Sequence, residues 1–315
     1  MIDITSKDKN TEIYEDPNIF NKNLNLTQED EVEIEFYLKD LTSRFPKDRE
    51  NYYLSYSGGR DSHFLYWFIK EYLHDNKIEI VSINTYMEHN EILNRMKNNS
   101  DIMLLPKMKP FEIKDKFGSP CFSKMQDGII DRYQRGSRAK STMERIYGYD
   151  SSGRSWTKFK LNNVARNKLL DGTLHRVSPK CCEYLKKRTA HDYEKQSKKH
   201  PIIAVRGSEG ALRKSKYTSC FSKNGKFHPI YDLTDDLLRK IEIKYNIEVP
   251  KIYNYIKRTG CMGCPYGSYK HDTEKELYLV TKQQRNFLSH YFKESYEVLN
   301  IDIEKIKREC GDYKN

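Results

Sequence analysis

The chain has 315 residues and a formal net charge of +11, with 32% charged residues. That length is enough for one large α/β domain with appendages and for a substantial core. The sequence has no run of about 18 apolar residues, so we expect no membrane span. Its first ten residues, MIDITSKDKN, lack the basic and then apolar start of a secretory signal, so the expected compartment is the cytoplasm.

The charge is spread unevenly along the chain. Residues 1–40 contain eleven Asp and Glu against four Lys, whereas residues 107–200 contain 23 Lys and Arg against ten Asp and Glu. A region as basic as 107–200 attracts phosphate, either in nucleotides or in a nucleic acid such as DNA or tRNA. Segments of this kind are often only solvated surface, so charge alone leaves both interpretations open.

The predicted elements begin after a polar stretch. Thr27 is a candidate N-cap with acidic residues in the turn behind it, which predicts a helix from Gln28 to about Ser43. The β-prone run Tyr52–Tyr56 leads into two glycines, and apolar residues at helical spacing follow from Asp61 to Leu73. The other elements predicted before residue 206 are strands at Glu79–Asn84, Ile102–Leu105 and Pro201–Val205, and a helix at Glu88–Met96.

Strands that alternate with helices predict an α/β fold, with a parallel sheet and helices on both of its faces. The Gly-, Arg- and Lys-rich stretch from Arg135 to Arg154 is predicted to be a loop. Thr234 caps a predicted helix from Asp235 to about Tyr245, and one or two helices are predicted from Lys275 to about Leu299. We expect an acidic extension and helix over 1–45, a central domain over 46–270 with a basic insertion at about 107–180, and a helical region over 271–315.

The most informative segment is Ser57-Gly58-Gly59-Arg60-Asp61-Ser62, which stands between a predicted strand and a predicted helix. Glycines let the backbone adopt positive φ and approach a phosphate closely. The N–H groups of such a loop, with a helix N-terminus behind them, make an anion site. Ser57 and Ser62 can add hydroxyl donors, and Asp61 can orient the loop or help to hold Mg²⁺. The loop matches neither a Walker A nor a G-x-G-x-x-G pattern, which disfavours kinases and dehydrogenases.

Six segments in the same order resemble the PP-loop superfamily of ATP pyrophosphatases and phosphoadenosine phosphosulfate (PAPS) reductases, over roughly residues 50–270. Besides the S-G-G-x-D-S loop, the matching segments are Asn84–His89, Cys181–Lys186, Arg206–Arg213, Asp232–Ile241 and Arg258–Pro265. The departures are Asn84 and Tyr86 in the D-T-G-x-E-x segment, Gly210 at a usual serine, and missing tryptophans around Thr234. Residues 116–124 also resemble a segment of the DndC-like, often phage-encoded, branch.

The resemblance implies an adenine-nucleotide α-hydrolase-like (Rossmann-like) fold, with ATP or PAPS outside the carboxyl ends of a twisted parallel sheet. Arg206 and Arg213 would bind phosphate or sulfate, because a guanidinium suits bidentate binding of oxyanions. The catalytic residues that the resemblance implies are Asp61, Lys186, Arg206 and Arg213. The implied nucleotide-binding residues are those of the loop, 57–62, together with Thr85, Glu88, Arg206, Gly207 and Glu209.

The seven cysteines cluster in a way that indicates metal, iron–sulfur or redox chemistry rather than disulfide bonds. Cys181-Cys182 and the C-x-x-C of Cys261 and Cys264 supply four thiolates. Some reductases of adenosine phosphosulfate, which this pattern resembles, bind a 4Fe-4S cluster with such a set. Zinc is the alternative, because four cysteines also suit tetrahedral Zn²⁺. Cys220 could replace Cys181 as fourth ligand, and the sequence leaves the two sets open.

Three functions stay open on the sequence. In the first, an acceptor oxygen attacks the α-phosphate of Mg·ATP, and the adenylated acceptor, which can be a nucleic acid, then reacts with a sulfur or nitrogen nucleophile supplied by a donor. The intact loop favours it. In the second, a thiolate reduces PAPS or adenosine phosphosulfate with a thiol reductant protein. Glu309-Cys310-Gly311 resembles the tail of such reductases, but Asp312 and Tyr313 depart from it. The third is a nucleotide- or nucleic-acid-binding protein without turnover.

Overall fold

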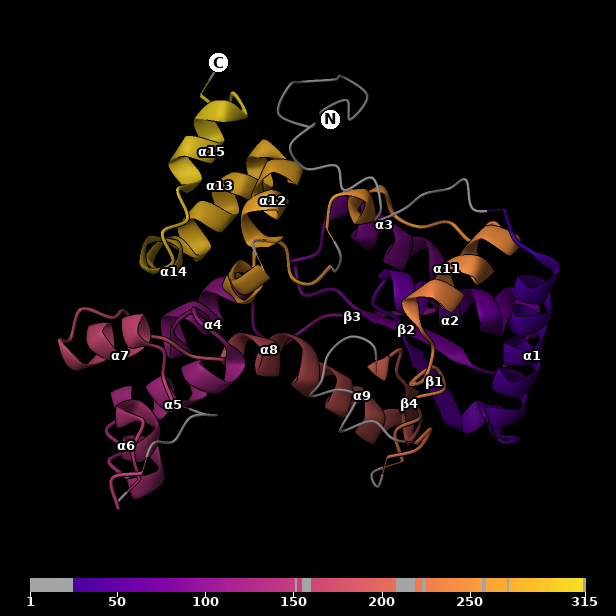
Figure 1. The fold of residues 1–315 in the computed structure, drawn as a ribbon, viewed down its shortest axis with the longest axis horizontal. Helices are drawn as coiled ribbons and strands as arrows, with labels where there is room; N and C mark the ends of the chain where they lie inside the picture. Colours follow the sequence, from indigo (N-terminus) through magenta and orange to yellow (C-terminus); the bar gives the residue numbers. More distant parts are fainter. Residues whose placement is uncertain are drawn as a thin grey trace.

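The computed structural model describes residues 25–150, 152–154, 160–207, 219–222, 225–256, 259–270 and 272–313. Its centre is a parallel sheet in the order β3-β2-β1-β4, as Figure 1 shows. Leu54 pairs with Ile80 on one side and with Ile202 on the other. The strands are β1 (Tyr52–Ser55), β2 (Glu79–Ile83), β3 (Ile102–Leu104) and β4 (His200–Ile202). The predicted α/β class is confirmed.

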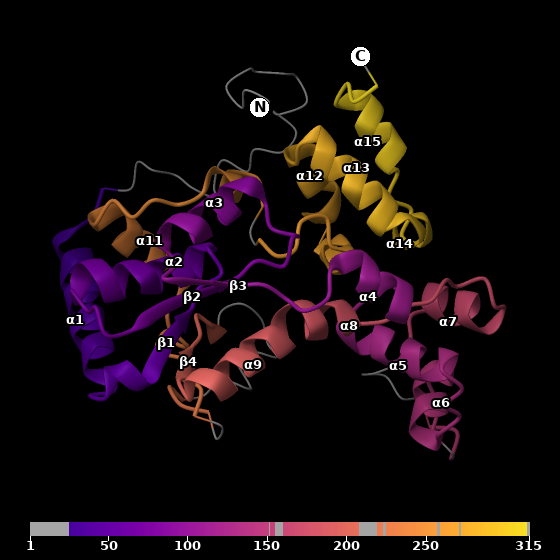
Figure 2. The same ribbon diagram turned by 180° about the vertical axis from the view of Figure 1, so that it is seen from behind.

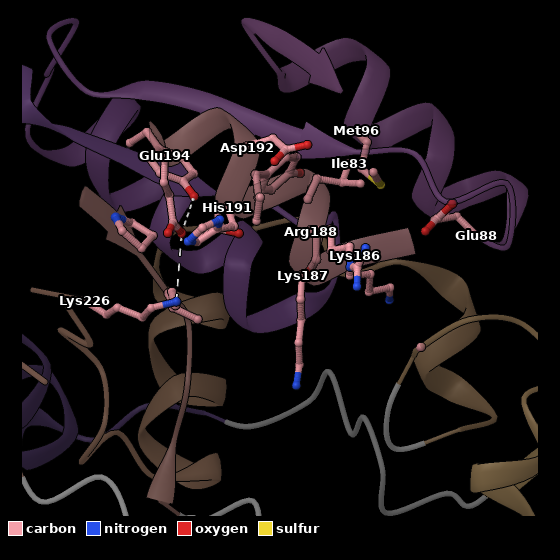
Figure 3. A pocket seen from close by; sticks show the side chains of 18 of the residues that line it. Ile83, Glu88, Met96, Lys186, Lys187, Arg188, His191, Asp192, Glu194 and Lys226 are labelled. Atoms are coloured by element: carbon pink, nitrogen blue, oxygen red, sulfur yellow. Dashed lines mark hydrogen bonds and ion pairs between the residues drawn. The ribbon is translucent and has the colours of Figure 1, made fainter. Parts of the chain in front are cut away.

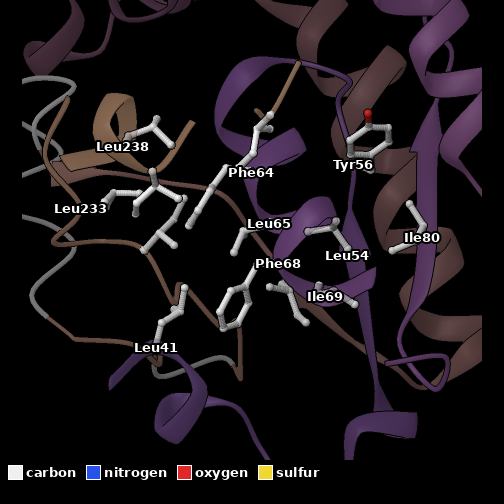
Figure 4. Close-up of a cluster of buried hydrophobic side chains, with 14 of the residues drawn as sticks. Leu41, Leu54, Tyr56, Phe64, Leu65, Phe68, Ile69, Ile80, Leu233 and Leu238 are labelled. Carbon is white, nitrogen blue, oxygen red and sulfur yellow. The ribbon is translucent and has the colours of Figure 1, made fainter. Parts of the chain in front are cut away.

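One face of the sheet is covered by a large apolar core (Figure 4). Successive side chains of a strand point to opposite faces, and Leu54 and Ile80 point into this core. Phe64, Leu65 and Phe68 fill it from the helix behind the glycine loop, and all three are fully buried. The helices that contribute are α1 (Gln28–Arg44), α2 (Arg60–Trp67, continued by a π-helical turn Phe68–Tyr72), α3 (Asn90–Asn99) and α11 (Asp235–Lys244).

The opposite face is covered by a helix that runs without a break from Lys180 to Ser197. Tyr193 of this helix packs with Tyr53 and Val81, which are the strand residues that point away from the large core. The helix consists of α8 (Lys180–Cys182), a π-helical stretch (Glu183–Lys187) and α9 (Arg188–Ser197). Helices therefore lie on both faces of the sheet, as expected.

Two further helical bodies have cores of their own. We call residues 121–177 the arm. Its described residues fold around Ile129, Ile130 and Ile146 and extend away from the sheet (Figures 1 and 2). The arm holds α5 (Lys124–Gln134), α6 (Lys140–Tyr147) and α7 (Asn163–Leu170), and α4 (Pro110–Phe117) precedes it. The C-terminal body consists of α12 (Asp272–Leu279), α13 (Lys282–Tyr291), α14 (Lys293–Val298) and α15 (Ile303–Glu309). Shorter 3₁₀ turns lie at Arg49–Asn51, Lys251–Asn254 and Pro265–Lys270.

Local signals predicted some elements well and others poorly. Thr27 caps α1 in a capping box with Asp30, so the first predicted helix is confirmed. The prediction of a loop over 135–154 is wrong for 140–147, because Lys140–Tyr147 is a helix whose Ile146 is fully buried in the arm. The prediction of one or two helices from Lys275 to about Leu299 is also too low, since α12, α13 and α14 lie there, and α15 follows beyond the predicted range. No helix in the described ranges has the length and apolarity that a membrane crossing needs.

His63 of α2 is a neutral histidine inside this fold. Its Nδ1 lies 3.0 Å from the hydroxyl of Tyr56, which in turn accepts a hydrogen bond from the side chain of Asn99 at 3.1 Å. The ring stacks on Tyr66 with centroids 5.5 Å apart. Burial, with a smaller effect of Arg95, lowers the pKa of His63 to about 3. The unfolded chain therefore binds a proton between about pH 3 and pH 6.5 that the folded chain does not.

We expect the free energy of unfolding to fall as the pH is lowered through this window, in part because of His63. In His63→Phe, which keeps a ring against Tyr66, the slope of unfolding free energy against pH should decrease by up to about 1.4 kcal/mol per pH unit. Urea titrations between pH 4 and 6 measure it. The exposed His191 provides the control for removing a histidine: the slope should decrease more in His63→Phe than in His191→Gln. An identical slope in His63→Phe and the parent would contradict the assignment.

Candidate functional site

The two glycines of the predicted loop are held in close packing. Gly58 has φ +70°, and a Cβ there would lie 2.9 Å from the backbone oxygen of Ile92 and 2.9 Å from Cγ of Met96. Gly59 has φ −74°, so only the first glycine needs the left-handed region. A Cβ on Gly59 would instead lie 2.9 Å from the hydroxyl of Tyr253. Neither position has room for a side chain.

The two serines of the loop have different positions. Ser57 is exposed at the end of β1, whereas Ser62 is buried. The hydroxyl of Ser62 lies 3.0 Å from that of Ser57, accepts a hydrogen bond from the Ser57 N–H at 3.3 Å and donates to the Gly59 carbonyl at 3.0 Å. Ser62 therefore closes the loop from inside, and Ser57 is the hydroxyl available to a ligand.

Arg60 ties the loop to α11. Its guanidinium donates two hydrogen bonds to the carboxylate of Glu242, at 2.7 and 2.6 Å. Its backbone N–H donates to the hydroxyl of Tyr253 at 2.9 Å, and that hydroxyl also lies 2.8 Å from the hydroxyl of Thr259. The structure thus places the Arg60 side chain against α11, where it fixes the start of α2.

Asp61 and Arg206 are brought together beside the loop. The Nε of Arg206 lies 3.0 Å from Oδ1 of Asp61, and its Nη1 lies 2.7 Å from Oδ1 of Asp235. Arg206 is only 5% exposed. The N–H of Gly207 donates to the carbonyl of Tyr231 at 2.7 Å, which holds the segment after β4 in place. Glu209 and Arg213, the other predicted residues of this segment, lie outside the described residues.

A cavity of about 980 Å³ opens at the carboxyl ends of β1 and β2 and beside β4, between the sheet and α9 (Figure 3). Among the described residues, Ser57, Glu88 and Lys186 are the predicted site residues that line it. Its charged lining is mixed, with an excess of one cation: Lys186, Lys187, Arg188 and Lys226 against Glu88, Asp192 and Glu194. The cations can pair with the phosphates of a ligand, and the carboxylates with a metal ion bound to them.

The segment after β2 forms one end of this cavity. Glu88 is nearly buried, and its carboxylate accepts hydrogen bonds from the Thr85 N–H at 3.0 Å, the Thr85 hydroxyl at 2.6 Å and the Met87 N–H at 3.2 Å. Thr85 is fully buried, so its hydroxyl serves to hold the Glu88 carboxylate in place. Lys186 lies between this carboxylate and a thiol: the charge of Cys261, and then that of Glu88, raises the pKa of Lys186.

Four of the five predicted cysteine ligands lie near one another and near Lys186. Burial and the neighbouring thiols raise the pKa of Cys264, and burial raises that of Cys261. A hydrogen bond with Cys181, together with Lys124 and Lys186, lowers the pKa of Cys182. Within the described ranges, no three Cys, His, Asp or Glu side chains are arranged to hold a single metal ion. The four sulfurs are therefore neighbours, but they do not form a compact site for one ion.

The remaining cysteines lie elsewhere. Cys220 packs against the large core, and the charges around it are those of Arg44 and Asp232 rather than those of other thiols. The structure thus separates Cys220 from the other four predicted ligands. Cys310 packs against the C-terminal core near Arg285, and burial raises its pKa. Cys121 is fully buried, and its N–H donates to Asp127.

The C-terminal body clamps the Cys261–Cys264 turn. The N–H of Gly263 donates to Glu276 at 2.8 Å, and the carbonyl of Gly263 accepts from the Tyr296 hydroxyl at 2.5 Å. Thr273 donates to the carbonyl of Cys264 at 2.8 Å. These three clamp residues are missed by sequence reasoning, because they stand on ordinary helices 9 to 33 residues beyond the residues that they hold and form no motif.

Sequence reasoning also misses most of the cavity wall. Lys187, Arg188 and His191 line the cavity from the helix that carries Lys186. The C-C-x-x-x-K segment could have pointed to them, because the helix that contains it simply continues. Lys226 comes from a turn with no recognisable motif, so only packing places it there.

Comparison with known proteins gives no family assignment. No family model matches the chain. No curated protein matches it either. Among solved structures it is similar to phosphoadenylyl-sulfate (PAPS) reductase from Candida auris in a phosphate complex, with 12% identity, 73% of this chain and 92% of that chain covered, and a TM-score of 0.36. It is also similar to the U34-tRNA thiolase NcsA from Methanococcus maripaludis with its 4Fe-4S cluster. That match has 12% identity, covers 89% of this chain and 80% of the thiolase chain, and has a TM-score of 0.35. Likenesses this distant do not decide the chemistry, which rests on the residues of the site.

Gly58→Ala should destabilise the fold more than a glycine-to-alanine substitution whose only cost is a positive φ. Gly172 is the matched control, because it has φ +78° and nothing within 4 Å of its would-be Cβ. Gly172→Ala should cost about 1–2 kcal/mol. Gly58→Ala should cost more, since its Cβ would also meet the backbone of Ile92. Urea unfolding measures both, and equal losses would show that the close packing at Gly58 is unimportant.

Tyr296→Phe should loosen the Cys261–Cys264 turn. Loss of the bond to the Gly263 carbonyl should cost about 1 kcal/mol and speed alkylation of both thiols in reduced, metal-free protein. Tyr291→Phe is the control, because the Tyr291 hydroxyl, in the same core, has no hydrogen-bond partner among the described residues. Mass spectrometry follows the labelling. Equal alkylation rates in the two variants would argue against the clamp.

Proposed function

We propose that the chain is a PP-loop enzyme that uses ATP to activate an acceptor for sulfur transfer. The observation that carries the proposal is the place of the glycine loop: it follows β1 at the mouth of a cavity whose lining includes four cations, and Ser57 lines that cavity. Open parallel sheets bind nucleotides outside the carboxyl ends of their strands, where the strand order reverses. Here the reversal falls at β1, which has β2 on one side and β4 on the other.

In the proposed reaction, an oxygen of the acceptor attacks the α-phosphorus of ATP. The new O–P bond forms as the bond from the α-phosphorus to the bridging oxygen breaks, and pyrophosphate leaves. Negative charge grows on the leaving group, where fixed cations such as Lys186 and Arg188 stabilise it without covalent chemistry. A sulfur nucleophile then attacks the adenylated carbon and AMP leaves.

Two carboxylates are candidates for holding Mg²⁺ with the nucleotide. Glu88 lines the cavity, and Asp61 stands in the first turn behind the loop, oriented by Arg206. A bound magnesium ion would neutralise part of the triphosphate charge. The buried Arg206 keeps Asp61 in one position, which is the role that the structure supports for this arginine.

The four neighbouring thiols suit an iron–sulfur cluster by their chemistry. Cys181, Cys182, Cys261 and Cys264 would hold it, and Lys124 and Lys186 would offset part of its negative charge. Such a cluster supplies a site for sulfide or for electrons. Zinc is the alternative at the same thiols, because four cysteine sulfurs also suit tetrahedral Zn²⁺.

Reduction of PAPS is the alternative at the same cavity, and the tail disfavours it. A reductase needs a thiol that reaches the bound nucleotide. Cys310 is instead packed beside Arg285, which is fully buried and bonded to Asp312 at 2.6 Å. Asp312, one of the residues that departs from the reductase tail, thus anchors the end of the chain.

Lys186→Gln should cut pyrophosphate release from Mg·ATP at least about 100-fold, because it removes a fixed cation from the cavity. Lys195→Gln is the matched control: it makes the same change on the same helix, at an exposed side chain that does not line the cavity, and should cost less than fivefold. The assay follows pyrophosphate after ATP, sulfide and candidate acceptors are mixed with anaerobically purified protein. Similar losses in both variants would mean that only net charge matters.

The same preparation separates the three functions. Pyrophosphate release that needs Mg²⁺ and Asp61 supports the proposal. Sulfite formed from PAPS, and lost in Cys310→Ser, would replace it with the reductase. Calorimetric binding of ATP with no product from any acceptor would leave a binding protein without turnover. Iron and zinc analysis of the anaerobic protein assigns the cysteine group independently.

A further inference from the structure

The arm is a strongly basic body to which, apart from Lys124 beside the thiols, the proposed reaction assigns no task. Residues 121–177 contain twelve Lys and Arg against five Asp and Glu. They fold around a separate core and extend away from the sheet in both ribbon views (Figures 1 and 2). None of the described residues that line the cavity belongs to the arm. Its positive charge is therefore presented to something other than the bound nucleotide.

Two tyrosine rings are exposed at the end of α6. Tyr147 is 47% exposed and Tyr149 is 57% exposed. Between them Gly148 ends the helix with φ +81°, which turns the chain sharply. Large aromatic side chains gain most of their stabilising effect from burial, so rings this open contribute little to the core of the arm. The pair instead offers aromatic surface to a partner.

Two cations lie near these rings, and the carboxylate of the nearby acid is bound by backbone N–H groups of its own turn. Cδ of Lys160 lies 3.1 Å from the position of a Cβ on Gly148, so its stem lies against the turn. Arg154 is exposed in the following turn. The carboxylate of Asp150 accepts hydrogen bonds from the N–H groups of Ser152 and Arg154, both at 2.9 Å. The exposed side chains around the turn thus include two aromatic rings and two cations.

We propose that this tip, formed by Tyr147, Tyr149, Arg154 and Lys160, is a stacking platform for single-stranded nucleic acid. Unpaired bases stack on aromatic rings while their phosphates meet neighbouring cations. In a duplex the faces of the bases are covered, so the rings favour an unpaired strand. The arm already contains one cation–π contact, since the guanidinium carbon of Arg138 lies 3.9 Å from the centroid of the Tyr133 ring. The inference rests on the proposed function only in treating the strand as the acceptor.

Fluorescence anisotropy with a labelled 20-nucleotide oligo(dT) or oligo(U), and with a duplex of equal length, tests the platform. Tyr147→Ala/Tyr149→Ala should weaken binding of the single strand at least tenfold and binding of the duplex less than threefold. Phe36→Ala is the matched control, because Phe36 is 75% exposed on α1 and should not matter. Arg154→Gln/Lys160→Gln should reduce the slope of log affinity against log salt by about 1.4. Circular dichroism checks that each variant is folded.

Several results would overturn the platform. They are no binding of oligo(dT) or oligo(U) by the parent chain at low salt, unchanged binding by the tyrosine variant, and equal losses for strand and duplex. Loss of self-association in light scattering, with strand binding intact, would assign the tip to a protein contact instead. Because none of these measurements uses ATP, failure of the platform and failure of the proposed nucleotide chemistry are distinguishable.

Discussion

The helix from Lys180 to Ser197 is the constraint on which both the cavity and the cysteine group depend. Tyr193 packs edge-on against Tyr53 with ring centroids 4.9 Å apart and donates a hydrogen bond to Glu79 at 2.6 Å, which fixes the helix on the sheet. Its first residues carry Cys181 and Cys182, and its π-helical stretch carries Lys186. π-Helical turns are rare and recur at functional sites. Any shift of this helix would move cations and thiols together.

The segment after β2 joins the same two sites from the other side. Glu88 lines the cavity, and the carbonyl of Met87 accepts a hydrogen bond at 2.7 Å from the N–H of Met262, inside the Cys261–Cys264 turn. Lys186 stands between the carboxylate and the thiols. Charges in a partly buried site are weakly screened, so a change of charge at the sulfurs acts on whatever the cavity binds. The geometry therefore couples the charge of the cysteine group to the cavity.

The sequence predicted the parts of the fold that local physics decides. The cap at Thr27, the strand before the glycines and the helix behind them each depend on residues within a few positions of one another. It failed at α6, because a Gly-, Arg- and Lys-rich composition is typical of a loop. That helix exists because Ile146 is buried in the core of the arm, a contact with residues distant in the chain.

The sequence by itself determined that a glycine pair stands between a strand and a helix, and that thiols occur in two close pairs. Only the tertiary structure decided that Cys220 lies apart from the other four predicted ligands, that Arg60 binds Glu242, and that Lys187 and Lys226 share one cavity with Lys186. The physical reason is the distance along the chain over which the interactions act. Backbone conformation follows from neighbouring residues, whereas which side chains meet across a cavity depends on how whole helices pack.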